Sequence, residues 1–172
     1  VARSMDAPQA LDQLPAQGML AMPVSYGTQA ADRAFLNRLR ERKPLLKVLA
    51  IGPALTYTQV DHVFSDLADA LLMGEAELAL PVAAERLLDG GLPTGCAVNP
   101  YTLAPHHYTP DGLLNDLDAV PMPAWQVFHN KRHPYPFLSV LSSRGCPAGC
   151  AYCPYVAAQG NLWRAQSPAR TA

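Results

Sequence analysis

Short apolar runs separated by an amphipathic stretch organise the first half of the chain. Residues 19–25, 45–51 and 69–73 are apolar over the length of a buried strand. Between the first two runs, residues 29–43 carry apolar side chains at three- and four-residue intervals, which predicts a helix with one buried face. Pro44 is expected to end this helix because proline cannot continue the helical hydrogen bonds.

A second helix is predicted over residues 77–88, where the apolar spacing is again helical. Gly90 and Gly91 follow it, and glycine is common just past a helix end. Strand, helix, strand and helix in this order predict a parallel α/β layer. Residues 1–18 contain no clear period and receive no assignment.

The second half of the chain has a different character. Prolines recur through residues 92–136, which predicts a linker with one short helical segment over 111–117. After the linker, residues 137–142 have the pattern of a buried strand that leads into a loop containing three cysteines.

Charge and hydropathy exclude two classes of protein. The 172 residues carry 13 basic and 14 acidic side chains, whereas nucleic-acid binders usually have a basic excess that neutralises phosphates. No apolar stretch approaches the roughly 20 residues that span a bilayer. The N-terminus does not resemble a signal peptide, so a cytoplasmic protein is expected. The first residue, Val1, suggests a fragment.

Cys146, Cys150 and Cys153 follow the spacing Cys-x3-Cys-x2-Cys. Cysteines this close form a poor disulfide framework, and thiolates are the usual ligands of iron–sulfur clusters. Three ligands on a four-iron cluster would leave one iron open to an exchangeable molecule. Gly145 and Gly149 suit a loop that folds back to direct its sulfurs inward, because glycine reaches backbone angles that other residues avoid.

The cysteine spacing, the preceding strand and the aromatic Tyr152 together resemble the radical S-adenosylmethionine (SAM) superfamily. The resemblance implies that Cys146, Cys150 and Cys153 hold a 4Fe-4S cluster and that Tyr152 lies near the adenine of SAM. It also implies an enzyme that cleaves SAM reductively to a 5′-deoxyadenosyl radical. The implied partners are a small-molecule or metabolite substrate and an electron donor such as flavodoxin or ferredoxin.

A second resemblance covers residues 19–125. Three segments resemble the cobalamin-binding class of radical SAM proteins. They are the strand ending at residues 52–53, residues 72–77 and residues 116–125. This resemblance implies a partial Rossmann-like cobalamin-binding domain over 1–91, the linker over 92–136, and the first strand and cluster loop of a partial (β/α) barrel over 137–172. Only 19 residues follow Cys153, less than one strand–helix unit, so a truncated fragment is expected.

Other interpretations of these residues stay open. The thiols could instead belong to a non-catalytic zinc-binding or electron-transfer module. For zinc, a fourth ligand could come from Cys96, His106, His107, His129 or His133, whereas an electron-transfer cluster needs a fourth cysteine, for which Cys96 is the candidate. Glu75 and Glu77 suit acid–base chemistry or, more simply, the start of the helix over 77–88. Arg144 could contact an anion or brace the cysteine loop.

Overall fold

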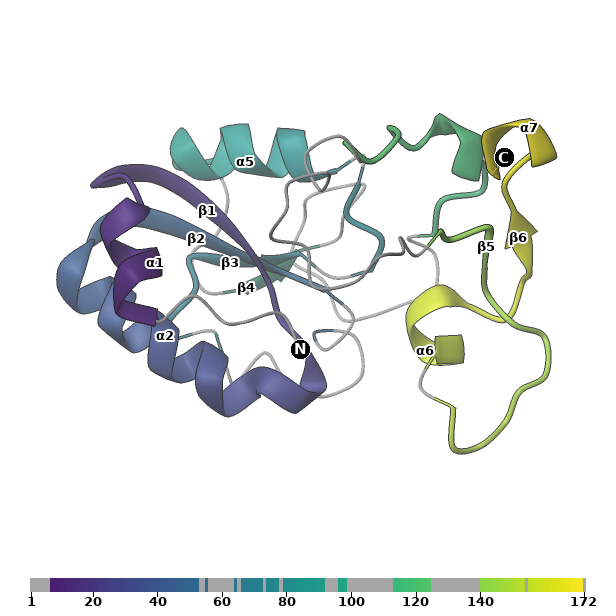
Figure 1. The fold of residues 1–172 in the computed structure, drawn as a ribbon, viewed down its shortest axis with the longest axis horizontal. Coiled ribbons are helices and arrows are strands. Elements are labelled where there is room, and N and C mark those ends of the chain that lie inside the picture. The colour runs from purple at the N-terminus through teal and green to yellow at the C-terminus, as the bar shows by residue number, and fades with distance from the viewer. Residues whose placement is uncertain are drawn as a thin grey trace.

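The computed structural model describes residues 7–52, 55, 64, 66–72, 74–77, 79–91, 96–98, 113–124, 140–153 and 155–171. Within these ranges the chain forms a four-stranded sheet with helices on both faces, followed by a smaller C-terminal part at one end of that sheet (Figure 1). No helix in these ranges has both the length and the apolar character that crossing a bilayer requires.

The main sheet is parallel throughout, with the strands in sequence order. It contains β1 (Gln17–Pro23), β2 (Leu45–Ile51), β3 (Ala70–Leu72) and β4 (Cys96–Val98). Gln17 pairs with Leu45, Leu49 with Ala70, and Ala70 with Cys96. The predicted parallel α/β layer is therefore confirmed, and β2 has the predicted bounds. The fourth strand comes from the range that we predicted to be linker.

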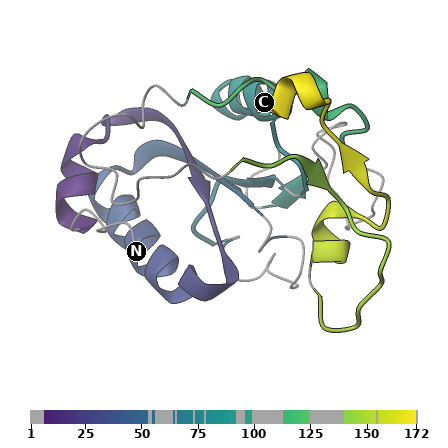
Figure 2. The ribbon, with the colours of Figure 1, turned by 45° about the vertical axis from the view of Figure 1, so that its right-hand side comes forward.

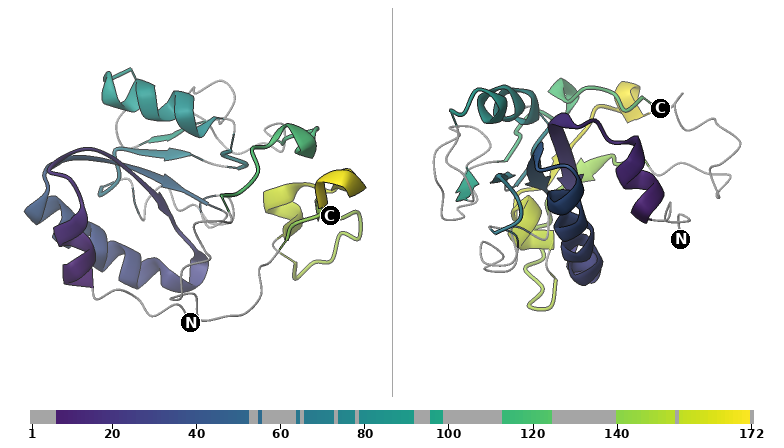
Figure 3. Two further views of the ribbon diagram at one scale, coloured as in Figure 1. Left: turned by 45° about the horizontal axis from the view of Figure 1, so that its top comes forward. Right: turned by 90° about the vertical axis from the view of Figure 1, so that its left-hand side faces the viewer.

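Helices cover both faces of this sheet. Figure 3 shows α2 (Gln29–Arg42) along one face and α5 (Leu80–Leu88) along the other. Helix α5 begins three residues later than predicted, with Pro81 in its first turn, where the missing N–H is tolerated. A 3₁₀ turn, η1 (Tyr26–Thr28), precedes α2. Helix α1 (Ala7–Gln13), which packs beside α2, lies in the range that received no assignment from the sequence.

The side chains of β2 alternate between the two faces of the sheet, so this strand packs against helices on both sides. Leu46 and Val48 are fully buried against Leu36 and Leu39 of α2, whereas Leu49 is fully buried against α5. Successive side chains of a strand point to opposite faces, so the apolar run of β2, which Lys47 alone interrupts, fits a strand covered on both sides. This pattern fixes the register, because a one-residue slip would exchange the two faces.

Asp69 holds the amino end of β3. Its carboxylate accepts hydrogen bonds from Arg40 at 2.6 Å, Lys47 at 3.2 Å and the Val48 amide at 2.8 Å. Burial raises the pKa of Asp69, but these three donors outweigh burial and leave the pKa below its usual value. The group lies at the opposite end of the strand from the site described below and is a structural connection between α2, β2 and β3.

The C-terminal part contains a short antiparallel ribbon with small helices around it. The ribbon consists of β5 (Ser143–Arg144) and β6 (Arg164–Ala165). Around it lie η3 (Leu117–Ala119), α6 (Tyr155–Gln159) and α7 (Pro168–Thr171). Figure 1 places the ribbon and α6 beyond one end of the main sheet.

Three expectations about this part require correction. Residues 140–142 form no strand, and Val140 and Leu141 are 60% and 49% exposed. The prediction of a buried strand over 137–142 is therefore wrong for the three residues of that range that the structure describes. The helix predicted over 111–117 is replaced, in its described residues, by loop leading into η3. The partial barrel is not confirmed, because β5 pairs antiparallel to β6 whereas barrel strands are parallel.

Candidate functional site

A cavity of about 370 Å³ lies at the carboxyl ends of the parallel strands. Pro23 ends β1, Ile51 ends β2, and both line it. The turn after β3 contributes residues 74–77, and the C-terminal part closes the cavity with Leu141, Arg144 and Gln159. Open α/β sheets bind ligands outside the carboxyl ends of their strands, so this is the position where a ligand site is expected.

Glu75 links the main sheet to the C-terminal part. Its side chain is 5% exposed, and its two oxygens accept hydrogen bonds from the two terminal nitrogens of Arg164 at 2.8 and 2.9 Å. The Leu114 amide donates to the same carboxylate at 2.7 Å. Arg164 also donates to the Gln159 carbonyl at 2.7 Å. A paired arginine fork and carboxylate fix orientation as well as distance, so this pair sets how β6 lies against the sheet.

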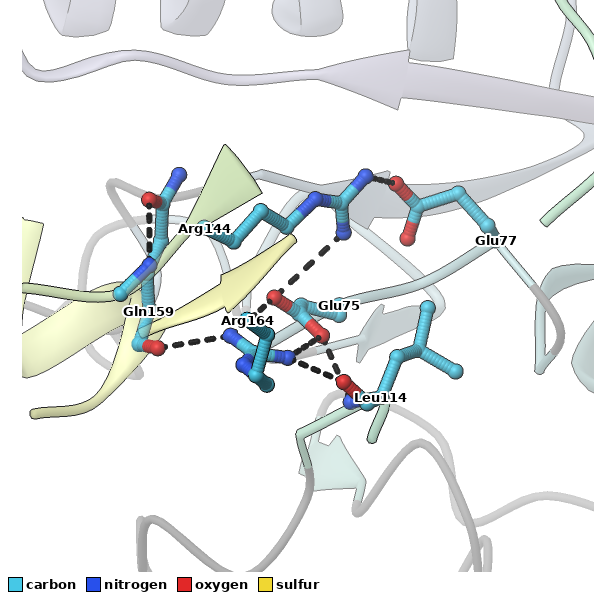
Figure 4. A network of polar contacts seen from close by, with 7 residues as sticks. Glu75, Glu77, Leu114, Arg144, Gln159 and Arg164 are labelled. Carbon is cyan, nitrogen blue, oxygen red and sulfur yellow. Dashed lines mark hydrogen bonds and ion pairs between the residues drawn. The ribbon is translucent and has the colours of Figure 1, made fainter. Parts of the chain in front are cut away.

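Arg144 of β5 forms the second connection. It donates a hydrogen bond to Glu77 Oε1 and lies 3.4 Å from Glu75 Oε1, as Figure 4 shows. Arg144 and Arg164 therefore balance Glu75 and Glu77. The four side chains form a polar network of zero net charge, and Glu75, Glu77 and Arg144 of this network line the cavity.

Both members of the Arg144–Glu77 pair are charged at neutral pH. Burial raises the pKa of Glu77, but the hydrogen bond from Arg144 outweighs burial and the pKa lies below its usual value. Burial likewise lowers the pKa of Arg144, and the two glutamates more than compensate, so that its pKa is raised. Glu77 is therefore a hydrogen-bond acceptor, which argues against a role as a proton donor.

The cysteine loop lies beside this network and faces outward. Cys146 and Cys150 are exposed, Cys153 is partly buried, and all three are free thiols. Tyr152 is 88% exposed. In Figure 2 the loop extends away from the main sheet. A hydrogen bond holds the start of the loop: the Cys146 amide donates to the Gly160 carbonyl, which follows α6, at 3.2 Å.

Two glycines give the loop its shape, as predicted. Gly145 and Gly149 have φ values of 82° and 61°, in the left-handed region. They differ in their surroundings: a Cβ on Gly145 would lie 2.0 Å from the Leu162 carbonyl oxygen, whereas a Cβ on Gly149 would meet open space.

Replacing Gly145 by alanine is therefore expected to destabilise the protein more than replacing Gly149. The left-handed conformation alone costs about 1–2 kcal/mol for alanine at either position. Gly145→Ala must in addition displace the backbone at Leu162, which also moves Arg164. Urea unfolding of both variants measures the difference, and equal destabilisation would contradict the close approach of these two segments.

The described residues contain no group of three or more histidine, cysteine, aspartate or glutamate side chains that could hold a metal ion. Cys146, Cys150 and Cys153, which lie on one loop, therefore form no such group. The candidate fourth ligands His106, His107, His129 and His133 lie outside the described residues, and for Cys96 only the backbone, in β4, is described.

Two proteins that are named as uncharacterized methyltransferases are similar to this chain. The chain is 27% identical over 125 residues to a Pyrococcus horikoshii protein named as an uncharacterized methyltransferase, covering 69% of this chain and 27% of that protein. It is 27% identical over 140 residues to a Synechocystis protein of the same description, covering 78% of this chain and 22% of that protein. The chain thus spans about a quarter of the length of these relatives. No protein-family profile and no solved structure matches it.

These relatives correct the functional assignment made from the sequence. Both are named for methyl transfer, and neither name refers to a radical SAM, iron–sulfur or cobalamin protein. The radical SAM assignment, with its 4Fe-4S cluster, 5′-deoxyadenosyl radical and cobalamin domain, is therefore wrong on these comparisons. The side-chain arrangement agrees, since the described thiols form no metal-binding group. Cofactor binding by Cys146, Cys150, Cys153 and Tyr152 stays a prediction that no observation tests.

The sequence identified part of the polar network and missed the rest. Glu75 and Glu77 precede α5 by several residues, and they pair with arginines from the C-terminal part. Arg144 braces the loop, which was one of its two open interpretations. Arg164 and Gln159 carried no signal in the sequence, because an isolated arginine or glutamine in a tail is typical of a solvated surface.

Proposed function

We propose that this chain is part of a methyltransferase that takes its methyl group from SAM, and that the cavity at the carboxyl ends of the strands receives this methyl donor. Similarity to two proteins named as methyltransferases carries the proposal, since each covers more than two thirds of the chain. In the reaction the methyl group leaves the sulfonium sulfur of SAM for an acceptor, and S-adenosylhomocysteine is released.

The cavity supports this proposal by its place and its lining. It lies where open α/β sheets bind ligands, and its volume of about 370 Å³ suits a small molecule. Pro23, Ile51, Leu80 and Leu141 provide apolar walls, and the polar network provides a few fixed hydrogen-bonding groups. Because the network is neutral overall, it favours neither a strongly anionic nor a strongly cationic ligand.

The cysteine loop is the second element of the proposal. Arg144 lines the cavity and lies two residues before Cys146, so a ligand in the cavity lies close to the base of this loop. We retain Cys146, Cys150, Cys153 and Tyr152 as proposed cofactor contacts, and a small molecule or metabolite as the proposed methyl acceptor. An electron donor was expected only for radical chemistry and is not part of this proposal.

Titration calorimetry with SAM and S-adenosylhomocysteine tests the proposal directly. We expect one molecule of either ligand to bind per chain. Ala76→Phe, which places a ring in the cavity, is expected to weaken binding at least about tenfold. Val82→Phe is the matched control, because Val82 is 46% exposed on α5 and does not line the cavity.

Two outcomes would contradict the proposal. One is the absence of heat with either ligand at about millimolar concentration, the weak end of measurable affinity, for protein that circular dichroism shows to be folded. The other is binding that Ala76→Phe leaves unchanged. If Ala76→Phe fails to fold, Leu141→Trp fills the same cavity from the C-terminal side, where Leu141 is half exposed and has room to change.

A further inference from the structure

The cysteine loop ends in a turn that has a cysteine at each end. Residues 151–152 form the centre of this turn. The Cys153 amide donates to the Cys150 carbonyl at 3.0 Å, which is the hydrogen bond that closes a four-residue β-turn. Cys146 lies before the turn and takes no part in it. The backbone therefore selects Cys150 and Cys153 as a pair among the three cysteines of the loop.

A turn of this kind brings its two ends within the reach of a disulfide bond. The first and fourth Cα atoms of a β-turn lie less than about 7 Å apart, and disulfides usually join Cα atoms separated by about 4.4–6.8 Å. Both thiols are free in this structure. Closeness in sequence is a poor basis for a framework that joins distant segments, but it is no obstacle to a bond that closes within one turn.

The surroundings of the turn leave the two cysteines room to react. Every residue from 146 to 152 is exposed, and the loop extends away from the main sheet (Figure 2). Gly149, directly before the pair, has a left-handed backbone and open space around the position of a Cβ atom. A small rearrangement of the turn therefore disturbs little packing.

The two thiols differ in exposure, and this difference assigns them different steps. Cys150 is exposed, so an external reagent can reach it, whereas Cys153 is partly buried. Thiol–disulfide exchange begins when an accessible thiolate attacks one sulfur of a disulfide, and a second thiol then attacks the mixed disulfide. Two thiols are sufficient for this chemistry, whereas a structural zinc site takes four ligands.

We propose that Cys150 and Cys153 form a redox-active dithiol that exchanges with a low-molecular-weight disulfide such as glutathione disulfide. The Cys150 thiolate attacks one sulfur of glutathione disulfide, and the first glutathione leaves. The Cys153 thiolate then attacks the Cys150 sulfur of the mixed disulfide, and the second glutathione leaves. The chain loses two electrons and two protons, which convert one glutathione disulfide into two glutathione thiols. This activity goes beyond the proposed methyl transfer and does not depend on it.

Thiol trapping followed by mass spectrometry tests the proposal on the whole chain. The reduced protein is incubated with glutathione disulfide in the absence of oxygen, and the remaining thiols are blocked with iodoacetamide. We expect the thiols of Cys150 and Cys153 to disappear together, with no glutathione left on either residue. Chymotrypsin cleaves after tyrosine and so cuts between them at Tyr152. The internal bond then appears as two peptides that separate only on reduction.

Two serine variants identify the pair. In Cys153→Ser the mixed disulfide at Cys150 has no second thiol within the turn, so we expect it to persist at least about tenfold longer than in wild type. Cys146→Ser is the matched control, because it makes the same substitution in the same loop outside the turn. It should form the internal bond as the wild type does, and circular dichroism should show both variants to be folded.

Several results would overturn the proposal. The first two concern the wild type, which needs no substitution: no reaction of Cys150 with glutathione disulfide, or glutathione that stays attached to Cys150 without an internal bond. Loss of the internal bond in Cys146→Ser would assign the pairing to a different cysteine. Decay of the mixed disulfide in Cys153→Ser at the wild-type rate would do the same.

Discussion

Arg164→Ala is expected to lower the free energy of unfolding by about 3–5 kcal/mol, because it removes the hydrogen-bonded cation of the buried Glu75 carboxylate and leaves only Arg144, 3.4 Å away. The side chains of Arg164 and Glu75 are 4% and 5% exposed, so water cannot replace the lost partner without a rearrangement. The C-terminal part should separate from the sheet. Urea unfolding measures the stability, and hydrogen exchange measured by mass spectrometry should show faster exchange over residues 140–171.

Two further variants test whether the loss of stability in Arg164→Ala arises from burial of the ion pair. Asp12→Ala breaks the ion pair between Asp12 and Arg42, whose side chains are 63% and 48% exposed, and should change stability by less than about 1 kcal/mol. Replacing Glu75 and Arg164 together by methionine should cost less than the two single changes added, because no unpaired charge remains. A loss below about 1 kcal/mol in Arg164→Ala would contradict the buried pair.

Asp69→Ala is expected to destabilise the protein by about 2–4 kcal/mol. The change removes three hydrogen bonds at once and leaves the Val48 amide without its acceptor. The loss is smaller than for Arg164 because Arg40 and Lys47, at 27% and 44% exposed, can return to water. Urea unfolding at neutral pH measures this loss, and a cost below about 1 kcal/mol would show that the group contributes little.

The Asp69 contribution also depends on pH. Because the folded-state pKa lies below the unfolded value of about 3.9, the stabilisation is complete above that value. It is lost as the pH falls through the lower, folded-state pKa. The difference in unfolding free energy between wild type and Asp69→Ala should therefore be constant at neutral pH and shrink below about pH 4. A difference that stays constant down to acid unfolding would contradict the depressed pKa.

Local patterns predicted β1, β2 and β3 of the main sheet and missed β4. The apolar run of β2 and the spacing of α2 both express burial against neighbouring elements, and such burial leaves a regular trace in the sequence. The short α1 has no such regular trace. Leu11 is buried there, but seven residues are too few for a period to be read.

The C-terminal part shows where local patterns fail. Val140 and Leu141 are apolar in the manner of a strand and yet exposed, so composition alone gave the wrong element. The polar network of the candidate site could not be predicted from the sequence for a related reason. Glu75 and Arg164 are polar residues whose burial depends on each other, and nothing near either one in the chain marks the other as its partner. The cysteine spacing drew the functional prediction toward cluster chemistry, which the methyltransferase relatives contradict.

Glu75 and Arg164 are separated by 89 positions along the chain. By contrast, the strand pairings of β1 with β2 and of β2 with β3 join segments close in sequence. Closing a long loop costs entropy that is repaid only when its final contacts form, so the order of folding should follow these separations. During synthesis the sheet can pair while Arg164 has yet to be made, and Glu75 then remains hydrated until the last part of the chain arrives to complete the cavity.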